Sequence, residues 1–442
     1  MTPEGSSVPS PGGLANAKGD GVNALPNELS DAYPASLKAV LARFPIKGGE
    51  LIVGGKPVSQ WVAERGSPLY LYDRAVLAWR AAEMRKHMPK GLEVTYAVKA
   101  NPKVEMLREI GPLYDGIDLA SFGEMKNALA AGIPAAKMSF AGPGKTLPEL
   151  EFAIDQGIGT LSIESERELE HISFIAKKLG KVARILIRVN PAFELSRSGL
   201  KMGGGPKQFG IDSERVPAAI ASVIADPNMS FEGIHIFSGT QNLSADSILE
   251  ASGKILAYAA ELQAECGAPF RILNLGGGFG IQYFKNDVEL DLAKVGVGLA
   301  EQLAAFRPKF PGTRFKIELG RYLVGECGLY VAKVLYRKLS RGAVFLVLDG
   351  GMHHHLPASG NMSLSPLKRQ MQITVGNRLN APMEKANVVG PLCTPLDSFG
   401  FGIDLPRADE GDVVVIPNSG AYGFSVSPLG FLSHPHPQEI IV

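Results

Sequence analysis

Residues 116–163 read GIDLASFGEMKNALAAGIPAAKMSFAGPGKTLPELEFAIDQGIGTLSI, and short apolar runs alternate there with segments of helical period. The runs 116–120, 137–141 and 159–163 have the length of strands, and residues 121–131 follow the spacing of an amphipathic helix. Such alternation is typical of β-α units whose strands run parallel. The stretch therefore predicts the repeating part of an α/β fold.

The same alternation extends in both directions, over residues 67–325. Helical patterns recur at 164–179 and 245–266, and the apolar runs add up to eight candidate strands. Eight β-α repeats close most economically into a parallel (β/α)8 barrel, and an open doubly wound sheet is the alternative. The remaining five candidate strands are 93–98, 183–189, 232–236, 271–275 and 315–319.

The two ends of the chain have a different character. Beyond residue 325 the helical patterns thin out, and strand-like runs predict a C-terminal antiparallel β domain over 326–442. Residues 26–66 are expected to pack on that domain, and residues 1–25, with almost no bulky apolar side chain, predict a disordered tail. The strand-like runs of the second domain are 330–336, 344–348 and 412–416.

Composition narrows the classes of partner. Lys and Arg number 45 against 44 Asp and Glu, so the net charge of +1 provides no field for nucleic acid or anionic lipid. No apolar run reaches the roughly 18 residues that span a bilayer, and the three cysteines match no zinc pattern. Consecutive histidines at 353–355 point in different directions and predict no metal site. We expect a cytoplasmic protein without a membrane or nucleic-acid partner.

Reactive groups of a β/α barrel lie where its strands end. Lys99 ends the run 93–98 and places an amine at the barrel mouth, where it can attack an aldehyde. The alternative is a lysine that caps a strand in solvent. Gly276, Gly277 and Gly278 follow the seventh strand, and their backbone N-H groups can close around a phosphate or simply form a tight turn.

Three further side chains carry chemistry of their own. His235 ends the sixth strand, with Ser238 one short turn away, so its ring either stacks on a flat cofactor or is a buried hydrogen-bonded histidine. Glu318 ends the eighth strand and can keep a heterocyclic nitrogen protonated, or else pairs with Arg321. Cys393 is either a small buried apolar group or, if it faces a barrel mouth across a subunit boundary, a proton donor.

The order of these features along residues 60–442 resembles the fold-type III pyridoxal-phosphate decarboxylases. The resemblance implies an alanine-racemase-like barrel, a following β domain and a head-to-tail homodimer with shared active sites. It implies that Lys99 holds the cofactor as a Schiff base, that Glu318 pairs with the pyridine nitrogen, and that Cys393 protonates the product from the neighbouring subunit. Cofactor contacts are implied for Asp118, Glu124, Arg188, His235, Ser238, Gly276, Gly277, Gly278, Arg321 and Tyr422.

Glu318 favours decarboxylation over racemisation. A carboxylate that keeps the cofactor ring positively charged strengthens the ring as an electron sink, whereas the related alanine racemases place an arginine there. Lys99 and Cys393 together argue against a silent, inhibitor-binding homologue. We therefore expect a decarboxylase, with a racemase and a silent regulator as the weaker alternatives.

Thr394 is the main departure from the resembling family. The decarboxylases of basic amino acids carry an acidic residue at this place, and a hydroxyl cannot compensate a buried ammonium. The segments 201–204, 349–355 and 390–395 resemble a branch that decarboxylates a glutamyl group on an acyl-carrier protein and has relatives in exosortase gene sets. The expected substrate is such a tethered group, and a free amino acid of the diaminopimelate type is the alternative.

Overall fold

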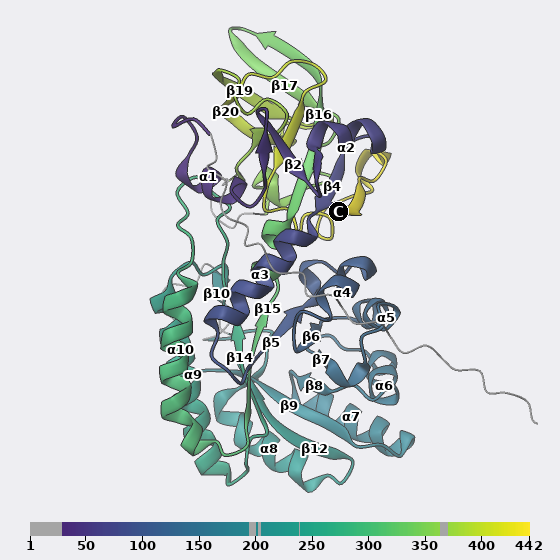
Figure 1. Ribbon diagram of the computed structural model, residues 1–442. Helices are drawn as coiled ribbons and strands as arrows, with labels where there is room; N and C mark the ends of the chain where they lie inside the picture. The colour runs from purple at the N-terminus through teal and green to yellow at the C-terminus, as the bar shows by residue number, and fades with distance from the viewer. Residues whose placement is uncertain (1–28, 194–199, 202–204, 238, 363–369) are drawn as a thin grey trace, which may run out of the picture.

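The two largest sheets of the described residues lie in the lower and upper halves of Figure 1. The expected disordered tail, residues 1–25, lies outside the described part of the chain. Ser238 and residues 202–204, which also carry predictions, lie outside the described part of the chain as well. The computed structural model describes residues 29–193, 200–201, 205–237, 239–362 and 370–442.

The lower sheet is a closed parallel barrel. Its strands are β5 (Leu92–Ala97), β6 (Gly116–Leu119), β7 (Met138–Phe140), β8 (Thr160–Ile163), β9 (Ala183–Asn190), β12 (Met229–His235), β14 (Ile272–Gly277) and β15 (Arg314–Leu319). They follow one another in the order β9-β12-β14-β15-β5-β6-β7-β8, and β8 pairs with β9 to close the ring. Each coincides with a predicted strand, so the barrel is confirmed and the open sheet is wrong.

Helices cover the outside of the barrel (Figure 1), and the three predicted helical patterns, 121–131, 164–179 and 245–266, each contain one of them. In α7 the Ser165 side chain accepts from the N-H of Glu168 at the start, and Gly180 takes the left-handed conformation at the end. The helices are α3 (Arg74–His87), α4 (Val104–Ile110), α5 (Phe122–Ala130), α6 (Leu147–Asp155), α7 (Glu166–Leu179), α8 (Val216–Ala225), α9 (Ala245–Cys266), α10 (Leu292–Phe306) and α11 (Arg321–Val324).

The upper sheet confirms the C-terminal β domain, with mixed strand directions. Antiparallel pairs dominate, but β17 runs parallel to β19 and β22 parallel to β4, and residues 349–382 supply the long connection that a parallel pair needs. Although β4 falls within 67–325, it pairs with β16 and β22. The strands are β4 (Leu69–Tyr72), β16 (Gly328–Ser340), β17 (Ala343–Leu348), β18 (Thr374–Val375), β19 (Met383–Val389), β20 (Ser398–Pro406), β21 (Val413–Ile416) and β22 (Gln438–Ile441).

The N-terminal segment is hydrogen-bonded to the upper sheet's connections. The N-H of Leu51 donates to Gly376 at 2.9 Å, and the N-H of Leu379 donates to Gly49 at 2.7 Å. Among the described residues no helix has the length and apolar content needed to cross a membrane. The segment contains α1 (Ala35–Leu41), β1 (Ile46–Lys47), β2 (Glu50–Val53), β3 (Lys56–Pro57) and α2 (Val58–Arg65).

One segment of the β domain reaches the barrel mouth. The N-H of Tyr422 donates to the carbonyl of Ala100 at 2.7 Å, directly beyond β5. The side chain of Asn418 donates to the carbonyl of Gln282 at 2.6 Å, beyond β14. These bonds bring Tyr422 over the carboxyl ends of the barrel strands. The short strands β10 (Leu200–Lys201), β11 (Ile211–Asp212) and β13 (Gly239–Thr240) also lie in connections that follow barrel strands.

Candidate active site

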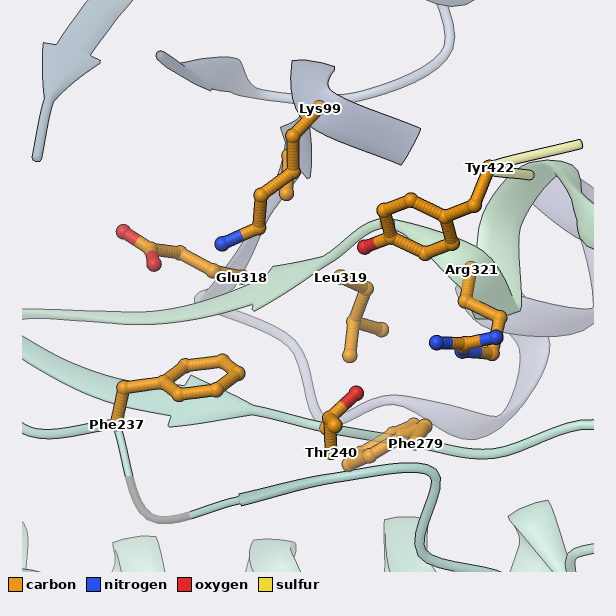
Figure 2. A pocket seen from close by; sticks show the side chains of 11 residues that line it. Lys99, Phe237, Thr240, Phe279, Glu318, Leu319, Arg321 and Tyr422 are labelled. Atoms are coloured by element: carbon orange, nitrogen blue, oxygen red, sulfur yellow. The ribbon is translucent and has the colours of Figure 1, made fainter. Parts of the chain in front are cut away.

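A cavity of about 160 Å³ lies where the barrel strands end, beneath Tyr422. Figure 2 shows Lys99, Glu318 and Tyr422 pointing into the same space, with Phe237 and Thr240 on the opposite side. The barrel rule therefore located the cavity correctly. The predicted residues that line it are Lys99, Gly278, Glu318, Arg321 and Tyr422, and the residues that sequence reasoning missed are Ala97, Phe237, Thr240, Phe279, Leu319 and Gly320.

Lys99 lies in a short turn, Val98–Ala100, that directly follows β5. Its ammonium is 5.5 Å from the centre of the Phe237 ring and lines the cavity. No hydrogen bond or ion pair joins this amine to another residue in the described part of the chain. Lys99 is exposed, and its amine is available to a ligand in the cavity that it lines.

Glu318 carries a buried negative charge at the cavity floor. The side-chain amide of Asn274 donates to one carboxylate oxygen, and His235 Nε2 is 3.3 Å from the other. Burial alone would raise the pKa of Glu318, but the imidazole of His235 and the amide of Asn274 outweigh it and lower the pKa. The Glu318–Arg321 ion pair considered from sequence does not form, since Arg321 donates to the hydroxyl of Tyr283 instead.

A layer of polar side chains inside the barrel supports Glu318. His235 is 2% exposed, and its Nδ1 is 2.9 Å from Ser162 Oγ, so both ring nitrogens face polar groups. Asp118 accepts from Ser139 Oγ at 2.8 Å, and burial together with the charge of Glu318 raises its pKa well above the ordinary value. His235 and Asp118 thus lie beside the cavity rather than in its wall.

Arg321 presents an unsatisfied cation to the cavity. Its guanidinium carbon is 4.7 Å from the centre of the Tyr422 ring and 5.2 Å from that of Tyr283, to whose hydroxyl it donates at 3.0 Å. Its Nε is buried without a hydrogen-bond partner among the described residues. A buried N-H group of a cation calls for an acceptor, so an anionic group of a ligand fits this place.

The segment after β14 needs glycine because neighbouring backbone lies too close for any other side chain. A Cβ atom on Gly277 would lie 2.0 Å from the carbonyl of Glu318, and one on Gly278 would lie 2.0 Å from the carbonyl of Gly239. Gly276 and Gly278 also have φ of +69° and +90°, which other residues rarely adopt. The segment therefore brings bare backbone to the cavity wall, where only Gly278 of the three is exposed to the cavity.

Arg188 and Glu124, expected to contact the cofactor, lie outside the cavity wall. Arg188 donates to the buried carboxylate of Glu164 at 2.7 Å and covers the Phe209 ring at 4.9 Å. Glu124 accepts from the N-H of Ala120 at 2.7 Å. Their contacts brace the ends of β9 and β6.

Cys393 and Thr394 lie in a different place. They belong to the connection between β19 and β20, where Cys393 is exposed and Thr394 half-buried, and neither lines the cavity of their own chain. Of the histidines at 353–355, His354 and His355 direct Nε2 to the Pro435 carbonyl and to Ser419 Oγ. No group of three metal-ligating side chains occurs in the described part of the chain.

Comparison with known proteins agrees with this geometry. The family model for the pyridoxal binding domain of pyridoxal-dependent decarboxylases matches residues 74–325. The L-glutamyl-(BtrI acyl-carrier protein) decarboxylase of Niallia circulans is 37% identical, covering 85% of this chain and 88% of its own length. The diaminopimelate decarboxylase of Campylobacter jejuni is 32% identical, covering 82% and 88%.

A solved structure extends the match to the whole fold. The diaminopimelate decarboxylase of M. jannaschii superimposes with a TM-score of 0.84 at 25% identity, covering 91% of this chain and 93% of that one. The match spans both the barrel and the β domain. The chain therefore belongs to the pyridoxal-dependent decarboxylases of fold type III, enzymes whose cofactor is pyridoxal phosphate.

Proposed function

We propose that the protein decarboxylates a glutamyl-like group that is attached through its distal end to an acyl-carrier protein, and leaves a carrier-bound amine. The observation that carries this proposal is Thr394, an uncharged side chain next to Cys393. A distal ammonium would need a counter-charge in a buried pocket, whereas a thioester on a carrier arm needs none. The carrier-dependent activity of the Niallia circulans relative supports the same substrate class.

The cavity residues fit pyridoxal phosphate. When bound, the cofactor supplies an aldehyde that captures an amine and a ring that accepts the electrons released with carbon dioxide. Lys99 would hold the aldehyde, since its amine has no partner among the described residues. Arg321 would use its unsatisfied Nε for the phosphate, beside the backbone of Gly278 and the hydroxyl of Tyr422, and the contacts of Gly276 and Gly277 stay predictions. The contact proposed for Ser238 stays a prediction.

Glu318 would set the direction of the chemistry. Its pKa is lowered, so the side chain is an anion that can hold the proton of the pyridine nitrogen. His235 orients this carboxylate, because it lies between Glu318 and Ser162. Asp118, Glu124 and Arg188 would act from behind the cavity wall, by bracing the strand ends that carry the contacting groups.

We further propose a homodimer in which each cavity is completed by Cys393 and Thr394 of the neighbouring subunit. Cys393 would deliver a proton to the carbon that loses the carboxyl group. The exposed side chains of Leu396 and Met362, 49% and 50% exposed, flank this loop and offer apolar area for a subunit contact. The cytoplasmic location stays a prediction.

Release of carbon dioxide from matched substrates tests the proposal. Purified protein with pyridoxal phosphate is given glutamyl-carrier protein, free glutamate, lysine or meso-diaminopimelate at equal concentrations. We expect the carrier-bound substrate to react fastest, with the Lys99→Ala variant as the blank. Faster reaction of any free amino acid would overturn the tethered substrate, and no release from any of them would overturn the glutamyl-like class.

Decarboxylation of a free diamino acid is the second candidate. It is favoured by the similarity to the diaminopimelate decarboxylases of C. jejuni and M. jannaschii. It requires a carboxylate other than residue 394 to receive the distal amine. A competition experiment compares the two candidates. Because meso-diaminopimelate can inhibit carbon dioxide release from the carrier-bound substrate only if it enters the same pocket, absence of inhibition would exclude it as a substrate of this site.

A further inference from the structure

The connection between β19 and β20 is wrapped around one buried carboxylate. Asp397, 3% exposed, accepts from the N-H of Leu392 at 2.8 Å through Oδ2 and from the N-H of Met352 at 2.6 Å through Oδ1. Leu392 directly precedes Cys393, and Met352 belongs to the turn that follows β17. One side chain therefore joins the loop that carries Cys393 to a second segment of the β domain.

Glycines on both segments make room for this carboxylate. A Cβ atom on Gly390 would lie 2.3 Å from Asp397 Oδ2, and one on Gly351 would lie 2.5 Å from Oδ1. Any other side chain at either position would displace the carboxylate. Gly351 and Gly390 are thus explained by a single residue, Asp397, whereas Gly350 makes room for the hydroxyl of Tyr330.

Backbone bonds close the loop around Asp397. The N-H of Gly390 donates to the Asp397 carbonyl at 3.1 Å, and the N-H of Asp397 donates to the carbonyl of Thr394 at 3.2 Å. The N-H of Thr394 donates in turn to Leu392 at 2.8 Å. The positions of Cys393 and Thr394 therefore depend on the ring of bonds that Asp397 holds together.

A carboxylate suits this role better than an amide. Two backbone N-H groups converge on its two oxygens, and an amide would turn its own NH₂ toward one of them. No lysine or arginine pairs with Asp397 among the described residues, so its charge is satisfied by backbone donors. The side chain lies outside the cavity wall and has no contact with the groups around Lys99.

We propose that Asp397 is the positioning residue of the loop 390–396, and that it sets where Cys393 and Thr394 are presented to the substrate. The inference rests on the function proposed above for these two residues. It assigns Asp397 no contact with substrate or cofactor. Its effect on turnover must therefore pass through Cys393 and Thr394.

A double-mutant comparison tests the catalytic consequence. Asp397→Asn should lower kcat about tenfold in the wild-type background, with unchanged cofactor occupancy, and less than twofold in the Cys393→Ala background. The matched control is Asp404→Asn, an exposed aspartate of β20 paired with Lys385, which should leave kcat unchanged in both. Equal losses in both backgrounds, or loss of the cofactor, would overturn the inference. If Asp397→Asn does not fold, Asp397→Ser takes its place.

Thiol reactivity tests the loop itself, independently of the reaction. In a Cys266→Ser background, with Cys327 buried, iodoacetamide should alkylate Cys393 at a rate that Asp397→Asn changes at least threefold and Asp404→Asn leaves unchanged. An unchanged rate in Asp397→Asn would overturn the inference. If Cys393→Ala has no effect on turnover, the role proposed for Cys393 fails, and the alkylation rate alone decides whether Asp397 positions the loop.

Discussion

The barrel mouth and the Cys393 loop differ in how complete they are within one chain. At the mouth, Glu318 is 5% exposed and is held by Asn274 and His235, and the cavity is enclosed by the chain's own strand ends and Tyr422. The loop has its backbone tied down by Asp397, yet it leaves Cys393 exposed and faces no cavity of its own chain. One chain supplies the whole cofactor half of the site. The proton-donating half, Cys393, needs the cavity of a neighbouring subunit to act on.

The difference follows from the two architectures. Parallel strands of a closed barrel end together, so residues from β5, β14 and β15 converge on one point without further partners. The connection between two strands of an open sheet ends in solvent. If the two regions are separate halves of one site, substitutions in them should have separable effects.

Removal of the amine should have the largest effect. Lys99→Ala deletes the group in the cavity wall that can bond to the aldehyde, and turnover should fall by on the order of 10⁴-fold. Trapping with borohydride, followed by mass spectrometry of the peptide around residue 99, should find the cofactor in the wild type and none in the variant. Cofactor trapped on another lysine would move the reactive centre away from the barrel mouth.

Neutralisation of Glu318 should come next. Glu318→Gln keeps the shape and the contact with Asn274 but removes the charge, and turnover should fall about 10²-fold while the cofactor stays bound. Steady-state kinetics and the visible absorbance of the bound cofactor measure the two effects separately. Glu93→Gln, which changes the half-buried partner of the exposed Arg314, is the control. A variant with unchanged kcat would remove Glu318 from the electron-sink role.

Mixing two inactive variants tests most directly whether Cys393 acts on the cavity of the neighbouring subunit. Cys393→Ala should lower turnover about 10²-fold. An equimolar mixture of Cys393→Ala with Lys99→Ala should recover about one quarter of wild-type activity after subunit exchange. Half of the randomly formed dimers contain one chain of each variant, and each of these dimers has one intact site out of two. The two variants are unfolded and refolded together, and each refolded alone is the control. No recovery would mean that Cys393 serves the cavity of its own chain.

Site residues at the ends of strands could be predicted from the sequence, because the position of a strand end depends on local sequence alone. Lys99, Glu318 and Arg321 were found because each lies at or just beyond the end of an apolar run that was predicted as a strand. Asn274 and Ser162 were missed, although each is a polar residue within an apolar strand, because their partners come from neighbouring strands and depend on the register.

Long-range pairings were also beyond reach. The run Leu69–Tyr72 fits either sheet by its composition, and its pairings with β16 and β22 assign it to the upper one. Asp397 was missed for a similar reason, since the residues whose N-H groups it accepts are separated by 40 positions along the chain, at 352 and 392. Its one sequence signal is the pair of glycines, Gly351 and Gly390, that leave room for it.

The smallest expected effect concerns the substrate. Thr394→Asp places a carboxylate where the basic-amino-acid decarboxylases carry one. Because the new charge faces an uncharged arm, kcat/KM for glutamyl-carrier should fall about tenfold, which corresponds to about 1.4 kcal/mol. Release of carbon dioxide from meso-diaminopimelate should rise. Thr394→Val, which keeps the shape without the charge, is the control and should change neither preference. If Thr394→Asp left both rates unchanged, residue 394 would not face the substrate, and the loop would complete the site through Cys393 alone.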